Sequence, residues 1–305
     1  MVDMEVVQLG CEMYQRPSRP RNGPAMLNTL QRVALARFLS RGLIGVRRVV
    51  GASASACVTR GGVKWELDLA EGIDLSIYLL GAFEPRTVST YKRIVKPGDT
   101  VLDIGANIGA HTLPLARIVG EGGHIHAFEP TAFAFEKLMA NLARNPQLAG
   151  CVQANQAMLV ESEDTDTEPE IYSSWPLSDT EGVHALHAGR AKSTEGARAF
   201  TLDAYASKHA IDRVDFVKLD VDGHEGTVLA GANEVLDTHR PVVLMEFAPY
   251  VFDEGGFDRM VALVADRGYA FEDAGSGRAL PAEGPALRKA IPFGASWNVI
   301  ARPQG

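Results

Sequence analysis

The chain has 305 residues, which allows two domains at most and fits one enlarged α/β domain equally well. Its 46% hydrophobic and 22% charged content excludes a disordered or collagen-like chain. A net charge of −8 argues against nucleic acid or an anionic membrane as the main partner, because phosphate binding needs basic patches. Three distant cysteines, the lack of a long apolar run and an N-terminus without a basic-then-apolar layout predict a cytoplasmic protein with reduced thiols.

The first part of the chain is predicted to form an extension. Residues up to about 24 are irregular, and apolar residues at helical spacing predict an amphipathic helix over 26–43. Residues 64–69 alternate like a short strand, and residues 75–82 are typical of a helical turn. We assign residues 1–80 to this partly flexible extension.

Strand and helix patterns alternate regularly after residue 98. Strands are predicted at 100–104, 124–128, 152–157, 216–221, 242–247, 269–272 and 297–301, with helices at about 110–119, 132–145, 225–236 and 257–267. Such alternation implies a mostly parallel sheet with helices on both faces. Residues 81–305 are therefore assigned to one domain, in which a segment near 161–200 is an insertion.

Four of the predicted strands end in a carboxylate: Asp103, Glu129, Asp220 and Glu246. Ligands of open α/β sheets bind beyond the carboxyl ends of the strands, so these acids should converge on one crevice. Four acids in one place repel each other. A cationic or hydroxyl-rich ligand, or a metal, would explain why they gather there.

The turn after the first of these strands distinguishes between ligands. Its spacing is Asp-x-Gly-x-Asn-x-Gly, not the Gly-x-Gly-x-x-Gly of dinucleotide sites. Asp103 would repel a pyrophosphate but would suit an ammonium group. Glu129, 24 residues after Gly105, can accept both hydroxyls of a ribose. An ammonium, a ribose and no phosphate describe S-adenosylmethionine, although a tight turn capped by Asn107 is the alternative interpretation.

A second informative stretch is Asp-Phe-Val-Lys-Leu-Asp-Val-Asp-Gly-His-Glu, at 215–225. As a strand it would place Lys218, Asp220 and Asp222 on one face, which is costly in a buried strand unless they are paired or liganded. These side chains can form part of a site. Alternatively, Lys218 neutralises Asp220 and Glu225 caps the following helix.

The two stretches resemble the FkbM family of S-adenosylmethionine-dependent methyltransferases. The resemblance rests on Val101-Leu-Asp-Ile-Gly-Ala-Asn-Ile-Gly109, Ala127-Phe-Glu-Pro130, Val217-Lys-Leu-Asp-Val-Asp-Gly-His-Glu225, Pro241-Val-Val-Leu-Met-Glu246 and the preceding Phe83-Glu-Pro85. It covers about residues 80–250 and departs at Asp222, where the family usually has Glu. It implies a class I methyltransferase (Rossmann-like) fold, with a seven-stranded, mostly parallel sheet whose last strand is antiparallel. It also implies methyl transfer to oxygen, often on sugars, polyketides or other secondary metabolites.

The resemblance also implies roles for single residues. The methionine end of the cofactor is assigned to the first turn, the ribose to Glu129, and the adenine to the segment after the third strand. Glu84 either closes over this site or is a surface acid. The expected cofactor-binding residues are Glu84, Asp103, Gly105, Ala106, Asn107, Gly109, Glu129, Pro130 and Ala157.

Methyl transfer from a sulfonium is an in-line displacement, so alignment and exclusion of water supply much of the acceleration. A hydroxyl acceptor must also lose its proton, whereas a carboxylate acceptor need not. His224 is the candidate base, since histidine titrates near neutral pH, or else it only starts a helix. Asp220 and Lys218 are the other catalytic candidates. Asp220 and Glu246 offer the hard oxygen ligands that suit Mg²⁺, with Asp222 or His224 as the third ligand. Without a metal, Asp220 and Glu246 would instead hold substrate hydroxyls.

We therefore expect an enzyme that transfers a methyl group from S-adenosylmethionine to a hydroxyl or carboxylate of a small molecule, a sugar or secondary metabolite. The alternative is a catalytically silent scaffold of the same fold, against which the retained charged residues weigh. A nicotinamide-dependent oxidoreductase is excluded by Asp103 and the glycine spacing. A nucleic-acid methyltransferase is disfavoured by the net charge, and no membrane partner is expected. The apolar face of the 26–43 helix leaves a homo-oligomer open.

Overall fold

The computed structural model describes residues 29–165, 167–173, 176–177, 190–253 and 255–305. The irregular segment predicted before residue 25 lies outside these residues, as does part of the predicted insertion. No helix among the described residues is long and apolar enough to cross a membrane.

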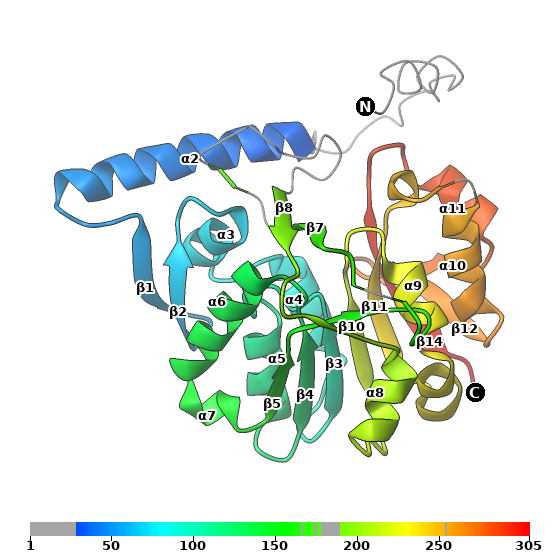
Figure 1. The fold of residues 1–305 in the computed structure, drawn as a ribbon. Helices are drawn as coiled ribbons and strands as arrows, with labels where there is room; N and C mark the ends of the chain where they lie inside the picture. The colour runs from blue at the N-terminus through cyan, green and yellow to red at the C-terminus, as the bar shows by residue number, and fades with distance from the viewer. Residues whose placement is uncertain (1–28, 166, 174–175, 178–189, 254) are drawn as a thin grey trace.

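The described residues form a central sheet of eight strands (Figure 1). Its strands, in spatial order, are β13 (Ala279–Leu280), β12 (Tyr269–Asp273), β14 (Trp297–Pro303), β11 (Val242–Phe247), β10 (Phe216–Leu219), β3 (Thr100–Ile104), β4 (His124–Phe128) and β5 (Val152–Asn155). The strands from β5 to β11 pair in parallel, and β14 is antiparallel to both of its neighbours. The predicted class I methyltransferase fold is confirmed, with β13 as an additional edge strand.

Helices cover both faces of this sheet, as the alternating pattern predicts. One face packs against α4 (Pro85–Tyr91), α5 (Thr112–Val119), α6 (Ala132–Ala143) and α7 (Pro146–Ala149). The other packs against α8 (Leu202–Lys208), α9 (Glu225–Ala230), α10 (Gly256–Ala265) and α11 (Gly284–Ala290). In β10 the alternation holds, since Val217 and Leu219 belong to one core and Phe216 to the other.

Two elements predicted between residues 216 and 236 are wrong in part. The helix expected over 225–236 ends at Ala230 and is followed by a five-residue π-helix, Val235–His239. At Gly231 a Cβ would lie 2.2 Å from the Val160 carbonyl oxygen, so the chain approaches its neighbour here and leaves the helical path. The strand expected over 216–221 ends at Leu219, and Asp222 has a left-handed φ of 50° in the following turn.

The N-terminal part packs on the same core as the main sheet. It contains α2 (Thr29–Val49), the hairpin β1 (Ser55–Arg60) and β2 (Val63–Asp68), and α3 (Gly72–Leu80). Trp65 and Ile77 share a hydrophobic cluster with Leu113 of α5. The helix predicted over 26–43 is found and is longer. The domain boundary at residue 80 stays a prediction.

The predicted insertion supplies two short pairings that lie near the carboxyl edge of the sheet. Strands β7 (Glu170–Ser173) and β8 (Arg190–Ser193) form an antiparallel pair. Strands β6 (Ala157–Leu159) and β9 (Arg198–Phe200) pair in parallel. The strand expected over 152–157 therefore ends at Asn155, where β5 stops pairing with β4. The chain continues from Ala157 as β6, which pairs with β9 at the end of the insertion.

Candidate functional site

A cavity of about 270 Å³ lies at the carboxyl ends of β3, β4 and β10, with residues of the insertion along one side. Neighbouring connections from β3 and β10 diverge here, which is where open α/β sheets bind ligands. Most of the predicted site residues line this cavity. They are Glu84, Gly105, Ala106, Asn107, Glu129, Pro130, Ala157, Lys218, Asp220, Asp222, His224 and Glu246.

The glycine-containing turn forms one wall of the cavity. Gly105 has a φ of +80°, and a Cβ there would lie 1.9 Å from the carbonyl oxygen of Asp220. Only glycine permits this approach of two backbone segments. Asn107 follows with a φ of 48°, and its side-chain oxygen accepts the N–H of Ile108 at 2.9 Å. These contacts fix the turn so that backbone groups of residues 105–107 lie at the cavity surface.

Glu129 is fixed by hydrogen bonds rather than left free to turn. One carboxylate oxygen accepts the N–H of Asn107 at 3.0 Å, and the other accepts the N–H and hydroxyl of Thr131 at 2.9 and 2.5 Å. Burial raises the pKa of Glu129, against the effect of the Thr131 hydrogen bonds. A buried carboxylate with this fixed direction is suited to accept hydroxyl groups of a ligand.

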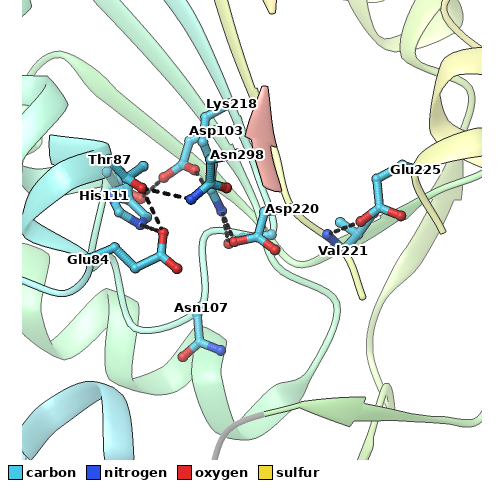
Figure 2. Close-up of polar contacts among 12 residues, drawn as sticks. Glu84, Thr87, Asp103, Asn107, His111, Lys218, Asp220, Val221, Glu225 and Asn298 are labelled. Carbon is cyan, nitrogen blue, oxygen red and sulfur yellow. Dashed lines mark hydrogen bonds and ion pairs between the residues drawn. The ribbon is translucent and has the colours of Figure 1, made fainter. Parts of the chain in front are cut away.

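Lys218 ties the turn to the end of β10 (Figure 2). Its ammonium donates to the Gly105 carbonyl at 3.1 Å and lies 3.2 Å from Asp220 and 3.9 Å from Asp103. Burial alone would lower the pKa of Lys218, but Asp220 and Asp103 outweigh it and raise the pKa. These contacts favour the structural interpretation of Lys218, in which it neutralises Asp220.

Two predicted cofactor residues do not reach the cavity. Asp103 is fully buried on β3, where the Thr112 hydroxyl donates to one of its oxygens at 2.5 Å. Strand register pairs Asp103 with Lys218, whose longer side chain reaches the Gly105 carbonyl and the cavity, whereas the carboxyl group of Asp103 stays fully buried. Gly109 lies behind the turn, and a Cβ there would be 2.8 Å from Leu138. Their expected direct contact with the methionine end is not supported by these positions.

Glu84 comes from a segment far from the core motifs and completes the opposite wall (Figure 2). It has a φ of 44° at the start of α4, and its carboxylate accepts the hydroxyl of Thr87 at 2.9 Å. The Thr87 hydroxyl in turn accepts from Asn298 of β14 at 3.1 Å. Burial, followed by repulsion from Asp220, raises the pKa of Glu84. The structure therefore favours the interpretation of Glu84 as a residue of the site over that of a surface acid.

His111 is a site residue that the sequence analysis missed. It lines the cavity just before α5, is 3% exposed, and has no hydrogen-bond partner for either ring nitrogen among the described residues. Its Nε2 lies 4.0 Å from the Glu84 carboxylate. Burial, followed by the charge of Lys218, lowers the pKa of His111 to about 3. A neutral ring with unused hydrogen-bonding capacity therefore faces the ligand space.

The three predicted metal ligands do come together. One carboxylate oxygen from each of Asp220, Asp222 and Glu246 lies within 4.8 Å of the others. Although Asp222 is exposed as a residue, its carboxyl group is packed among acids, and desolvation followed by Asp220 raises its pKa to about 7. Burial and Asp220 also raise the pKa of Glu246 well above its usual range. The cluster favours a positively charged group, and its role as a magnesium site stays a prediction.

His224 lies at the same end of the cavity and faces the insertion. Its Nδ1 is 3.8 Å from the carboxylate of Glu168, a lining residue that sequence analysis did not single out. The turn before His224 is held by Glu225, whose carboxylate accepts the N–H groups of Val221 and Gly223 at 3.0 and 3.1 Å. Glu225 thus ties the turn before α9 and does not cap the helix as the structural interpretation expects, since α9 has no side-chain cap at its N-terminus. The tied turn holds His224 beside the cavity.

Comparison with known proteins decides the family. A family model described as the methyltransferase FkbM domain matches residues 103–271, more than half of the chain. The chain belongs to the FkbM methyltransferase family. The matched range contains most of the cavity wall described above, and Glu84 precedes it.

The relatives of this FkbM-family chain are distant. It is 28% identical over 149 residues to the hexuronic acid methyltransferase AglP of Haloferax volcanii, a match covering 48% of this chain and 55% of that protein. It is 27% identical over 198 residues to the 31-O-demethyl-FK506 methyltransferase FkbM of Streptomyces tacrolimicus, covering 57% and 74%. The chain therefore spans about half the length of the first relative.

Solved structures of methyltransferases are also similar at low identity. An FkbM methyltransferase from Methylobacillus flagellatus KT has a TM-score of 0.39 and 14% identity, with 70% of this chain and 50% of that chain covered. A SAM-dependent O-methyltransferase from Thermotoga maritima has a TM-score of 0.40 and 13% identity, covering 85% and 82%. These likenesses are too distant to identify an acceptor.

The cavity of this FkbM-family protein fits S-adenosylmethionine. The close approach at Gly105 leaves backbone at the surface, and Glu129 presents a fixed acceptor to a ribose. Glu84 and Asp220 are carboxylates that line the cavity, and their charge would suit the ammonium and sulfonium of this cofactor. Neutral His111 could donate a hydrogen bond to the carboxylate of the methionine end. S-adenosylmethionine is accordingly the cofactor that family and geometry support.

Proposed function

We propose that the protein is an O-methyltransferase that acts on a hydroxyl group of a small sugar-containing or secondary-metabolite acceptor. The observation that carries the proposal is His224, which lies at the mouth of the cofactor cavity beside Glu168. A hydroxyl acceptor needs a base, and histidine is the side chain best suited to that role near neutral pH.

The protein's own part in the reaction is mainly to position. Bound S-adenosylmethionine supplies an electrophilic methyl group on a sulfonium. Asn107 and Glu129 fix the wall at the ribose, while Lys218 holds the turn against Asp220. Because an in-line displacement depends on alignment, this rigid wall supports the reaction more than any single charged group does.

The proton of the acceptor hydroxyl would pass to His224. Its Nδ1 faces the Glu168 carboxylate at 3.8 Å, so Nε2 is the atom available to take the proton. In this arrangement Glu168 is a positioning residue that favours the tautomer with the proton on Nδ1. With the proton held on Nε2 of His224, the acceptor oxygen would be free to react with the methyl group that the cofactor supplies, and the histidine ring would carry the positive charge.

The charge of the cavity selects against acidic acceptors. Its described lining contains seven carboxylic side chains and one lysine, and that lysine is already engaged by Asp103 and Asp220. An anionic acceptor would be repelled by the acids that stay ionised and would raise the pKa of Asp222 and Glu246 further, whereas neutral hydroxyls or an amine would be favoured. The relative named a hexuronic acid methyltransferase therefore does not define the acceptor here. The acids are Glu84, Glu129, Glu168, Glu170, Asp220, Asp222 and Glu246.

The first experiment is calorimetric titration of the purified chain with S-adenosylhomocysteine, once with EDTA and once with Mg²⁺. Micromolar binding in both buffers would support the cofactor assignment. Heat from Mg²⁺ that disappears in Asp222→Asn would support a cation at the three acids. Absence of binding in both buffers would leave the scaffold alternative.

The second experiment tests the acceptor. Methyl transfer from labelled S-adenosylmethionine is measured for matched neutral sugars, amino sugars and uronic acids. Transfer to neutral or amino sugars at oxygen, abolished in His224→Asn, is the expected result. Preferred transfer to the uronic acid would contradict the charge argument and would indicate carboxylate methylation, for which no base is needed.

A further inference from the structure

Helix α2 carries an apolar stripe that faces away from the protein. Its exposed apolar residues follow helical spacing at 35, 38 or 39, 46 and 49, and exposed Gly42 lies on the same side. Leu35 is 46% exposed, Phe38 74%, Val46 66% and Val49 87%. The stripe therefore extends from residue 35 to residue 49.

The opposite side of α2 is used for packing on the body of the protein. The Ser40 hydroxyl is buried and donates to the Leu69 carbonyl at 2.7 Å. Arg47 donates to the carbonyls of Ser53 and Ser55 at 2.9 and 3.0 Å. Because these bonds fix the rotation of the helix about its axis, the apolar stripe is directed outward. Figure 1 shows α2 across the top of the molecule with one end extending past the sheet.

The charge of α2 is opposite to that of the whole chain. The helix contains five arginines and no aspartate, glutamate or lysine, whereas the chain has a net charge of −8. Arg41 and Arg48 are exposed beside the stripe. An outward apolar stripe with arginines along one edge is the arrangement of helices that lie in a membrane interface, where the apolar side enters the acyl boundary and arginines meet phosphates.

We propose that α2 binds peripherally to an anionic lipid bilayer, with Phe38 and Val46 inserted at the interface. Charge decides between a bilayer and a second copy of the chain. Two α2 helices packed through their stripes would bring arginines together without any acid on either helix, whereas anionic headgroups complement them. The expectation that membranes are excluded came from the net charge of the whole chain, which conceals this basic helix.

The test is sedimentation of the full chain with vesicles. Binding to phosphatidylcholine vesicles that contain phosphatidylglycerol is expected, with much weaker binding to phosphatidylcholine alone and loss at high salt. The double variant Phe38→Ser, Val46→Ser and the double variant Arg41→Ala, Arg48→Ala should each reduce the bound fraction at least about tenfold. Phe293→Ser is the matched control, since Phe293 is 80% exposed outside α2.

Each other result overturns the proposal. Equal binding of wild type and stripe variants would place the lipid contact elsewhere. No vesicle binding, together with a dimer that dissociates in the Phe38→Ser, Val46→Ser variant, would identify a second copy as the occupant. If the monomeric full chain did not bind vesicles but a chain without residues 1–28 did, that segment would be identified as the occupant of the stripe. Circular dichroism of each variant checks that the fold is kept, and none of these readouts depends on methyl transfer.

Discussion

Three residues in the cavity wall have a left-handed backbone although none is glycine. They are Glu84, Asn107 and Asp222, with φ values of 44°, 48° and 50°. Such conformations cost on the order of 1 kcal/mol each and persist only where surrounding contacts impose them. Asn107 is held by Glu129, and the turn at Asp222 is held by Glu225. Among the described residues, three of the five non-glycine residues with a left-handed backbone thus line the cavity, which supports a functional wall.

Gly105→Ala should disrupt the site most directly. The new Cβ would meet the Asp220 carbonyl oxygen at 1.9 Å in a backbone conformation that alanine rarely adopts. We expect a loss of about 2 kcal/mol or more in unfolding free energy and no measurable binding of S-adenosylhomocysteine. Gly122→Ala is the control, because nothing lies within 4 Å of its added Cβ. Wild-type binding by Gly105→Ala would show that the turn adapts and that its close approach is not required.

His224→Asn should separate chemistry from cofactor binding. Removal of a general base costs on the order of 100-fold or more in kcat, while calorimetric affinity for S-adenosylhomocysteine should stay unchanged. Glu168→Gln should lower kcat about tenfold with KM unchanged, because only the tautomer and orientation of His224 are affected. His124→Asn, an exposed histidine outside the cavity, serves as control. Full activity in His224→Asn would assign the proton transfer to another residue.

At the scale of elements, two buried asparagines support the N-terminal hairpin: Asn141 in α6 and Asn145 between α6 and α7. The Asn145 side chain accepts the N–H of Lys64 at 2.9 Å and donates to the Lys64 carbonyl at 2.7 Å. It thus makes the two backbone hydrogen bonds that a neighbouring strand would make with β2. Asn141 accepts the N–H of Glu66 at 2.8 Å. Both asparagines have no exposed surface. The extension is therefore joined to the domain by specific bonds as well as by apolar packing.

Asn145→Ala should destabilise the whole domain by about 2–4 kcal/mol, because it leaves buried backbone groups of β2 without partners. Chemical denaturation followed by circular dichroism measures the change. Gln147→Ala, at an exposed position in the neighbouring α7, is expected to have almost no effect. If only the hairpin signal were lost while the sheet unfolded at its original midpoint, the N-terminal part would be an independent unit.

The elements that sequence analysis could predict are those whose signals are local. Strands 100–104, 124–128 and 242–247 agree with the structure because each is a short segment with apolar residues and a carboxylate at or near its end, followed by a turn or a helix. The contacts of Glu84 with Thr87, and of Thr87 with Asn298, join residues up to 211 positions apart. No periodicity records such contacts. His111 was missed for the same reason, since its burial depends on α4 packing over it.

At the scale of the whole molecule, charge is distributed unevenly in a way that the net value conceals. The cavity gathers carboxylates around a single engaged lysine, while α2 gathers arginines. The acids are brought together by strand topology, which parallel pairing makes predictable. The outward direction of the α2 stripe depends on Ser40 and Arg47, so it required the structure.

Buried titratable groups make the stability of the protein depend on pH in two opposing ways. Burial lowers the pKa of His111 to about 3 and of His126 to about 4, from 6.5. Below about pH 6.5 the unfolded chain binds more protons at these histidines, so unfolding free energy falls as pH falls. Burial raises the pKa of Asp222 and Glu225 to about 7, so the folded state holds more protons there and stability falls as pH rises towards 7.

Substitutions should separate these two effects in urea denaturation between about pH 4.5 and pH 7.5. His126→Gln should lessen the loss of unfolding free energy on the acid side, because the side chain that takes up a proton on unfolding is gone. His124→Gln is its control on the same strand, exposed at the surface. Asp222→Asn should lessen the fall in unfolding free energy as the pH rises from 5 to 7, because the amide stays neutral, as the folded site favours. If the unfolding free energy of wild type and of both variants changed with pH in the same way, the buried groups would not be the cause of the pH dependence of stability.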